Sequence, residues 1–163
     1  MTELFKTISN YHFFNYLLPG AIGTYYFQQM YNYSLEKSNI IILCCIYYLV
    51  GLLISRVGSL VISPILKCWL DFQPYDKYLC ASKKDQAIAG MSTIANMYRT
   101  LIALVLIISI FELIHNGVTY PLFVLFILGF ILLVASYIKQ TRLIVKRVRI
   151  ALETKEEPKH VEK

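Results

Sequence analysis

The sequence predicts an all-α integral membrane protein, a four-helix transmembrane bundle with an amphipathic helix at each end. Asp, Glu, Lys and Arg make up 16% of its 163 residues, against about 25% in a typical globular chain. They are also absent from four long stretches, residues 7–35, 38–55, 100–111 and 113–138. Because about 20 apolar residues cross the hydrocarbon core of a bilayer, such stretches indicate membrane-spanning helices.

The first part of the chain is predicted to hold a surface segment and two spans. Residues 1–12 place their apolar side chains on one helical face, which is typical of an amphipathic segment lying in the membrane interface. The first span covers about residues 13–33, and Pro19 within it should bend or break the helix. The second covers about residues 40–62 and contains one charge, Arg56.

The second part is predicted to hold a polar connection and two further spans. Residues 67–97 form the connection, in which Ser82 resembles the N-cap of a helix that runs unbroken into the third span. The third and fourth spans cover about residues 98–114 and 118–137. The four spans together form one transmembrane domain, residues 13–137.

The distribution of cations predicts the orientation. Fourteen of the 16 Lys and Arg residues lie in the N-terminal segment, in residues 67–99 or in the tail, residues 138–163. Lys37 is the only one expected on the other side, and Arg56 lies inside a span. Since cytoplasmic loops carry the excess of Lys and Arg, both termini are expected in the cytoplasm.

Small residues recur along the second span at four-residue intervals. They let two helices approach closely, which makes them candidate helix-packing residues. The contact could lie within one four-helix subunit, between subunits or around a pore. These residues are Gly51, Ser55, Ser59 and Ser63.

Four polar residues in or beside the spans are candidates to line a pore: Arg56, Asn96, Arg99 and Glu112. A charge at membrane depth usually faces a partner, a polar cavity or the interface. Each has a simpler alternative. Arg56 could reach the cytoplasmic headgroups with its long side chain, Arg99 could anchor the third span at the interface, and Glu112 could form a polar outer edge.

The tail begins as a basic amphipathic helix with one cationic stripe. The stripe is a candidate binding surface for an anionic nucleotide or oligonucleotide, or for an acidic partner protein. Attraction to anionic headgroups is the alternative explanation. Its residues are Lys139, Arg142, Lys146 and Arg149.

The sequence carries no motif for catalysis. It has no phosphate-cradling glycine loop, nucleophile elbow or HExxH motif, and its four cysteines form no CxxC pair. We therefore expect no enzyme, no catalytic residue, no cofactor and no metal site.

The segment Asn10-Tyr-His-Phe-Phe-Asn-Tyr-Leu-Leu-Pro-Gly20, the four spans and the basic tail resemble small membrane proteins of bacterial antiviral defence operons. The membrane subunits of the Hailong and Kiwa systems are examples. The resemblance implies a homo-oligomer, such as a tetramer, that acts as an effector channel in abortive infection. It also implies a nucleotide-derived signal from a cytoplasmic partner.

The function predicted from the sequence is therefore a gated ion channel or pore built from several copies of the chain. One four-helix subunit has too small a cross-section to enclose an aqueous pore and still pack its core. The alternative is a non-conducting anchor or adaptor that docks a cytoplasmic partner at the membrane, and a transporter comes third.

Overall fold

The computed structural model describes residues 12–32, 35, 39–68, 74–117 and 120–153, and within them it is almost entirely helical and contains no strand. The prediction of an all-α fold is confirmed for these residues. The predicted surface segment, apart from its last residue, and the end of the tail lie outside them. The helices, with η for a π-helix, are η1 (Phe13–Leu17), α2 (Leu18–Tyr31), α3 (Ile40–Val57), η2 (Gly58–Ile62), α4 (Ser63–Lys67), α5 (Tyr75–Lys84), α6 (Gln86–Asn116) and α7 (Tyr120–Glu153).

Two prolines explain the two π-helical segments. Pro19 follows η1, and Pro64 follows η2. A proline ring clashes with the carbonyl four residues earlier and cannot donate a backbone hydrogen bond. Those carbonyls belong to Asn15 and Leu60, which lie inside the π-helical turns. A widened turn accommodates the ring, so the helix continues instead of breaking.

The connection between α5 and α6 differs from the sequence prediction. Asp85, not Ser82, is the N-cap of the long helix: its backbone is extended, and its carboxylate accepts a hydrogen bond of 3.0 Å from the amide of Ala87. Ser82 lies inside α5 and donates to the carbonyl of Leu79 at 3.1 Å. A carboxylate satisfies free amides at a helix start, and here it separates α5 from α6.

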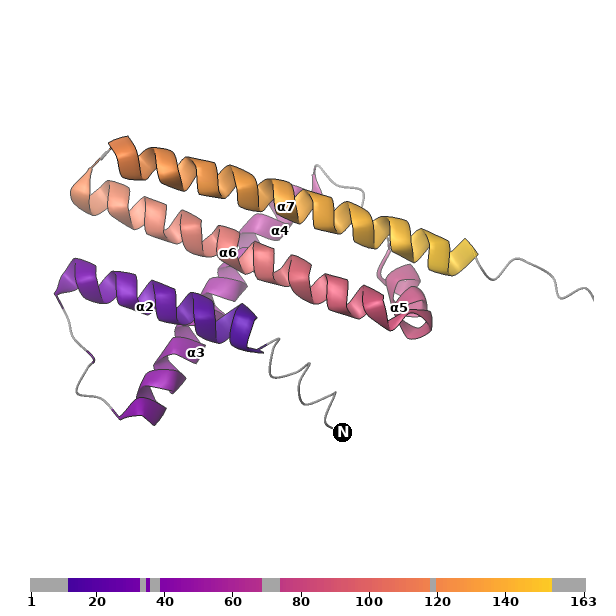
Figure 1. Cartoon of the computed structure of the whole chain (residues 1–163), viewed down its shortest axis with the longest axis horizontal. Coiled ribbons are helices and arrows are strands. Elements are labelled where there is room, and N and C mark those ends of the chain that lie inside the picture. The colour runs from indigo at the N-terminus through magenta and orange to yellow at the C-terminus, as the bar shows by residue number, and fades with distance from the viewer. Residues whose placement is uncertain (1–11, 33–34, 36–38, 69–73, 118–119, 154–163) are drawn as a thin grey trace, which may run out of the picture.

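The helices form a long hairpin with smaller elements against one side (Figure 1). The helices α6 and α7 run side by side in opposite directions, and α2 lies along α6. The helix α3 crosses them at a steep angle, so its first part projects away from the rest. The short helix α5 packs against the ends of α6 and α7 that lie furthest from their connection.

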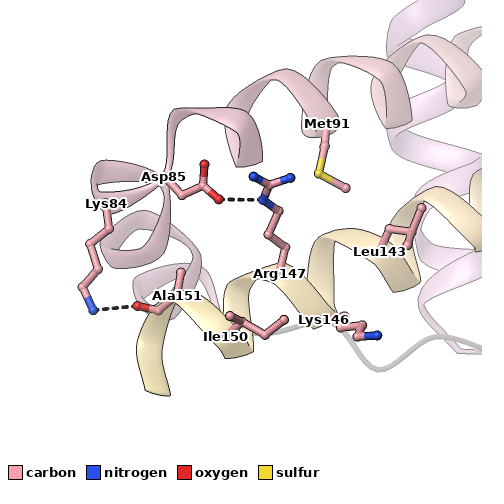
Figure 2. A pocket seen from close by; sticks show the side chains of 8 residues that line it. All are labelled: Lys84, Asp85, Met91, Leu143, Lys146, Arg147, Ile150 and Ala151. Atoms are coloured by element: carbon pink, nitrogen blue, oxygen red, sulfur yellow. Dashed lines mark hydrogen bonds and ion pairs between the residues drawn. The ribbon is translucent and has the colours of Figure 1, made fainter. Parts of the chain in front are cut away.

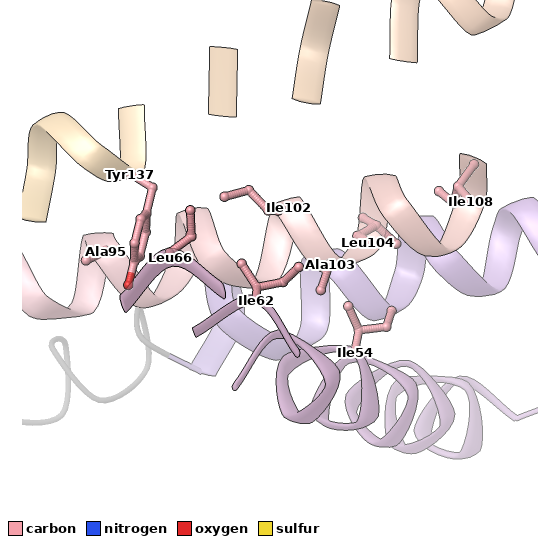
Figure 3. Packing of buried hydrophobic residues seen from close by; sticks show 9 residues of the cluster. All are labelled: Ile54, Ile62, Leu66, Ala95, Ile102, Ala103, Leu104, Ile108 and Tyr137. Atoms are coloured by element: carbon pink, nitrogen blue, oxygen red, sulfur yellow. The ribbon is translucent and has the colours of Figure 1, made fainter. Parts of the chain in front are cut away.

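The main core lies where α3 and η2 meet α6 and α7 (Figure 3). Ile54 and Ile62 pack against Ile102 and Leu104 of α6. From α7, the ring of Tyr137 reaches toward Leu66. A second cluster of Ala81, Ile88 and Val148 joins α5, α6 and α7. It holds the far ends of the hairpin together.

Within the described residues, three helices are long and apolar enough to cross a membrane: Ile40–Lys67, Gln86–His115 and Pro121–Glu153. The predicted first span, residues 13–33, is not one of them. Its helical part covers η1 and α2, from Phe13 to Tyr31, and it is shorter than the other three. Thr24 and Gln28 also make it less apolar than the other three.

Candidate functional site

A polar cavity of about 630 Å³ opens between η2, α4, α5, α6 and α7. It lies at the charged boundary of the third and fourth predicted spans, because Arg99 is the last cation before the uncharged part of α6. On α7, the uncharged stretch ends at Ile138, next to Tyr137 in the cavity wall. Its polar wall includes Ser59, Ser63, Asn96, Arg99, Tyr137 and Thr141.

Arg99 is half-buried in this wall. Its Nη1 donates to Ser63 Oγ at 3.2 Å, while its Nε is buried and makes no hydrogen bond to any described residue. Gly58 lets η2 approach α6 closely here, since a β-carbon on Gly58 would lie 3.1 Å from the carbonyl oxygen of Arg99. A buried guanidinium N–H without an acceptor is costly and favours an anion beside it.

Thr141 forms part of the opposite wall. It is 4% exposed, and its Oγ1 has no hydrogen bond of normal geometry to the described part of the chain. Thr100, also buried, differs, because its hydroxyl bonds to the Asn96 carbonyl at 3.0 Å and to Ser55 Oγ at 3.3 Å. The cavity therefore contains one buried guanidinium N–H, Arg99 Nε, without an acceptor among the described residues, and a buried hydroxyl, that of Thr141, whose neighbour is the hydroxyl of Tyr137.

The four pore-lining candidates are not brought together within one subunit. Asn96 and Arg99 both line the cavity. Arg56 is exposed on the outer side of α3, away from it. Glu112 lies near the other end of α6, where it accepts a hydrogen bond from the hydroxyl of Tyr26 on α2.

The small residues of the second span face the interior of the subunit. A β-carbon on Gly51 would stand 1.7 Å from the carbonyl oxygen of Tyr16. Ser55 accepts from Thr100 on α6, and Ser59 lines the cavity. Of the alternatives that the sequence leaves open, this arrangement favours packing within one subunit.

The cationic stripe of the tail lies on the exposed face of α7, and none of its members touches the polar cavity. Its residues are Lys139, Arg142, Lys146 and Arg149.

Two other cations, Arg147 and Lys84, join the last turns of α7 to the junction between α5 and α6. Arg147 Nε lies 2.6 Å from Asp85 Oδ2, and Lys84 Nζ donates to the Ala151 carbonyl at 2.8 Å (Figure 2). The hydrogen bond from Arg147, and a second from the backbone amide of Ala87, lower the pKa of Asp85 below its ordinary value of 3.8.

Sequence reasoning missed most of the cavity, including two polar residues of α7, Tyr137 and Thr141. They are four residues apart on α7, on the face that packs against α6. The position of Thr141 around the helix, relative to the cationic stripe, could have indicated that its side chain is buried. It lies next to Arg142 in the sequence but is turned by about 100° around the helix.

No group of three or more His, Cys, Asp or Glu side chains among the described residues could hold a metal ion. Comparison of the chain with protein-family models, with curated proteins and with solved structures finds no match.

Proposed function

We propose that the chain is an oligomeric membrane effector that forms a gated ion channel in the bacterial cytoplasmic membrane, acts in antiviral defence and is opened by a nucleotide-type signal. One observation carries the channel: the Arg56 side chain is exposed on the outer side of the apolar helix α3. A cation facing lipid is costly, whereas a second subunit or a water-filled pore would stabilise it. A ring of Arg56 side chains would favour anions.

The apolar surface of the subunit supports assembly. In the most apolar 18-residue stretch of Ile40–Lys67, only 11% of the stretch is buried inside the subunit. In the corresponding stretch of Pro121–Glu153, only 6% is buried. Lipid or further copies of the chain must cover these faces. A tetramer of such subunits would provide the cross-section that a pore needs.

The direction of α2 supports four spans with both termini in the cytoplasm. Phe27 packs edge-on against Phe111 with ring centroids 4.9 Å apart, and Tyr31 lies 6.0 Å from the ring of His115. The helices α2 and α6 therefore end at the same level and run in the same direction. Together η1 and α2 hold 19 residues and are roughly 28 Å long, close to the thickness of the hydrocarbon core.

Planar-bilayer recording of the purified full chain tests the channel. We expect discrete anion-selective currents whose selectivity weakens in Arg56→Gln. Arg149→Gln removes an exposed cation from the tail and should leave selectivity unchanged. Absence of current, both alone and with extract from infected cells, would overturn the channel.

The exposed basic stripe on α7 favours one alternative, an adaptor that docks an acidic cytoplasmic partner. A partner recovered with the wild-type chain and lost in Arg142→Glu with Lys146→Glu would support it, provided that no current is found.

A further inference from the structure

We propose that the cavity beside Arg99 binds the phosphate group of an anionic ligand, which is either a soluble nucleotide or a phospholipid headgroup. The carrying observation is Arg99 Nε, a buried donor without a hydrogen-bond partner among the described residues, in the wall of a cavity that also holds the buried hydroxyl of Thr141. Both can donate a hydrogen bond, and a phosphate oxygen is the acceptor that suits both.

The charge of the cavity suits an anion. Lys67 and Arg99 both line it, and none of the described residues in the lining is Asp or Glu. Arg99 already uses Nη1 on Ser63, which fixes the guanidinium and leaves its Nε edge for a ligand. A fixed guanidinium loses little freedom on binding, which favours recognition of phosphate.

Further donors surround the same space. The hydroxyls of Ser59, Ser92 and Tyr137 line the cavity, and the amide of Asn96 lies between Ser92 and Arg99 along α6. Hydroxyl and amide groups supply the neutral hydrogen bonds that accompany a cation in phosphate sites.

The cavity has room for more than a phosphate. Its volume of about 630 Å³ lies within the roughly 300–1,000 Å³ typical of small-molecule sites. Tyr75 and Tyr78 of α5 line its cytoplasmic side. Their rings could pack against a nucleotide base or against the glycerol part of a lipid.

The position of the cavity makes an anion able to act as a signal. Its walls come from η2, α4, α5, α6 and α7, so a bound phosphate could contact several helices at once. A ligand shifts a conformational equilibrium by its difference in affinity for the two states. Only this signalling role rests on the proposed function; the binding site itself does not.

The test measures ligand retention by native mass spectrometry of the full chain in nanodiscs. Two probes separate the sources: ADP added to nanodiscs of phosphatidylcholine, and phosphatidylglycerol mixed into the same lipid. We expect wild type to retain at least one probe and Arg99→Gln to bind it at least about tenfold more weakly. Arg142→Gln is the matched control, an arginine on the exposed stripe, and should bind ADP as wild type does.

A second variant covers the case in which Arg99→Gln fails to fold. Thr141→Val removes the hydroxyl but keeps the side-chain shape, so the ligand-free chain should still fold. Binding should weaken by about tenfold, because one donor to the phosphate is lost.

The outcomes are distinct. Retention of ADP alone supports a soluble ligand, retention of phosphatidylglycerol alone supports a headgroup, and competition between them supports one shared site. Retention of neither probe, or equal retention in wild type, Arg99→Gln and Thr141→Val, overturns the inference. Because no current is measured, loss of the channel proposal would leave this result standing, and the reverse also holds.

Discussion

Gly51 lies against the backbone carbonyl of Tyr16, and Gly20 lies in the same way against the carbonyl of Tyr47. In each case an added β-carbon would stand 1.7 Å from the oxygen. The two glycines therefore let η1 and α2 cross α3 in direct backbone contact. The crossing is possible only because both helices present hydrogen atoms where other residues carry side chains.

This crossing predicts that Gly51→Ala destabilises the subunit itself, before any effect on oligomer size. The obstructing atoms are backbone, which cannot rotate away, so we expect a loss of about 3 kcal/mol or more in the free energy of unfolding. Unfolding by denaturant in detergent, followed by circular dichroism, measures it.

Gly129→Ala is the control, since nothing lies within 4 Å of the added β-carbon in α7. It should raise stability by up to about 1 kcal/mol, because alanine is the better helix former. Similar effects of the two substitutions would show that the crossing is looser than described.

A second prediction concerns the contact between α2 and α6. Tyr26→Phe removes the hydroxyl that donates to Glu112, and should cost about 1–3 kcal/mol because the acceptor remains half-buried. Tyr25→Phe, on the exposed side of the same helix, should be neutral. Thermal unfolding of the two variants side by side provides the measurement, and equal midpoints would contradict the role of the hydrogen bond.

The ion pair between Asp85 and Arg147 predicts a pH dependence. Since the pKa of Asp85 is lower in the folded chain, the pair stabilises fully above the ordinary value of 3.8 and is lost as the pH falls through the lowered pKa. Asp85→Asn keeps an N-cap acceptor but removes the charge. The difference in unfolding midpoint between wild type and Asp85→Asn should be small, shrink with added salt and vanish at acid pH. A difference independent of pH would contradict this.

A fourth prediction tests the orientation. Cys80 is exposed on α5, which we expect in the cytoplasm, so a membrane-impermeant thiol reagent should label it only after the cells are opened. A cysteine at Asn116, where α6 ends, should react in intact cells. Labelling of Cys80 from outside would reverse the proposed topology.

The sequence predicts the helical class and the long helices well, because an uncharged apolar stretch of this length can form few structures other than a membrane-spanning helix. It fails at contacts set by single atoms. The stripe containing Gly51 could be recognised, but the helix that it touches could not. Thr141 appeared as an ordinary residue between a glutamine and an arginine, and only the packing of α7 on α6 places it in the same cavity as Arg99. Ser82 was predicted to cap the long helix, but Asp85 does so, because local spacing could not exclude a separate α5.

The π-helical turn of η2 has a mechanical consequence for the second span. It holds one residue more than an α-helical turn, so the chain beyond it is rotated about its own axis relative to α3. Conversion of that turn to α-helical geometry would unscrew α4 by roughly 100° while α3 stayed in place. Ser63 and Lys67 would then swing out of the cavity together and leave Arg99 without its hydroxyl partner. Leu66 would leave the main core with them, so a local change of winding beside Pro64 would dismantle one wall of the cavity.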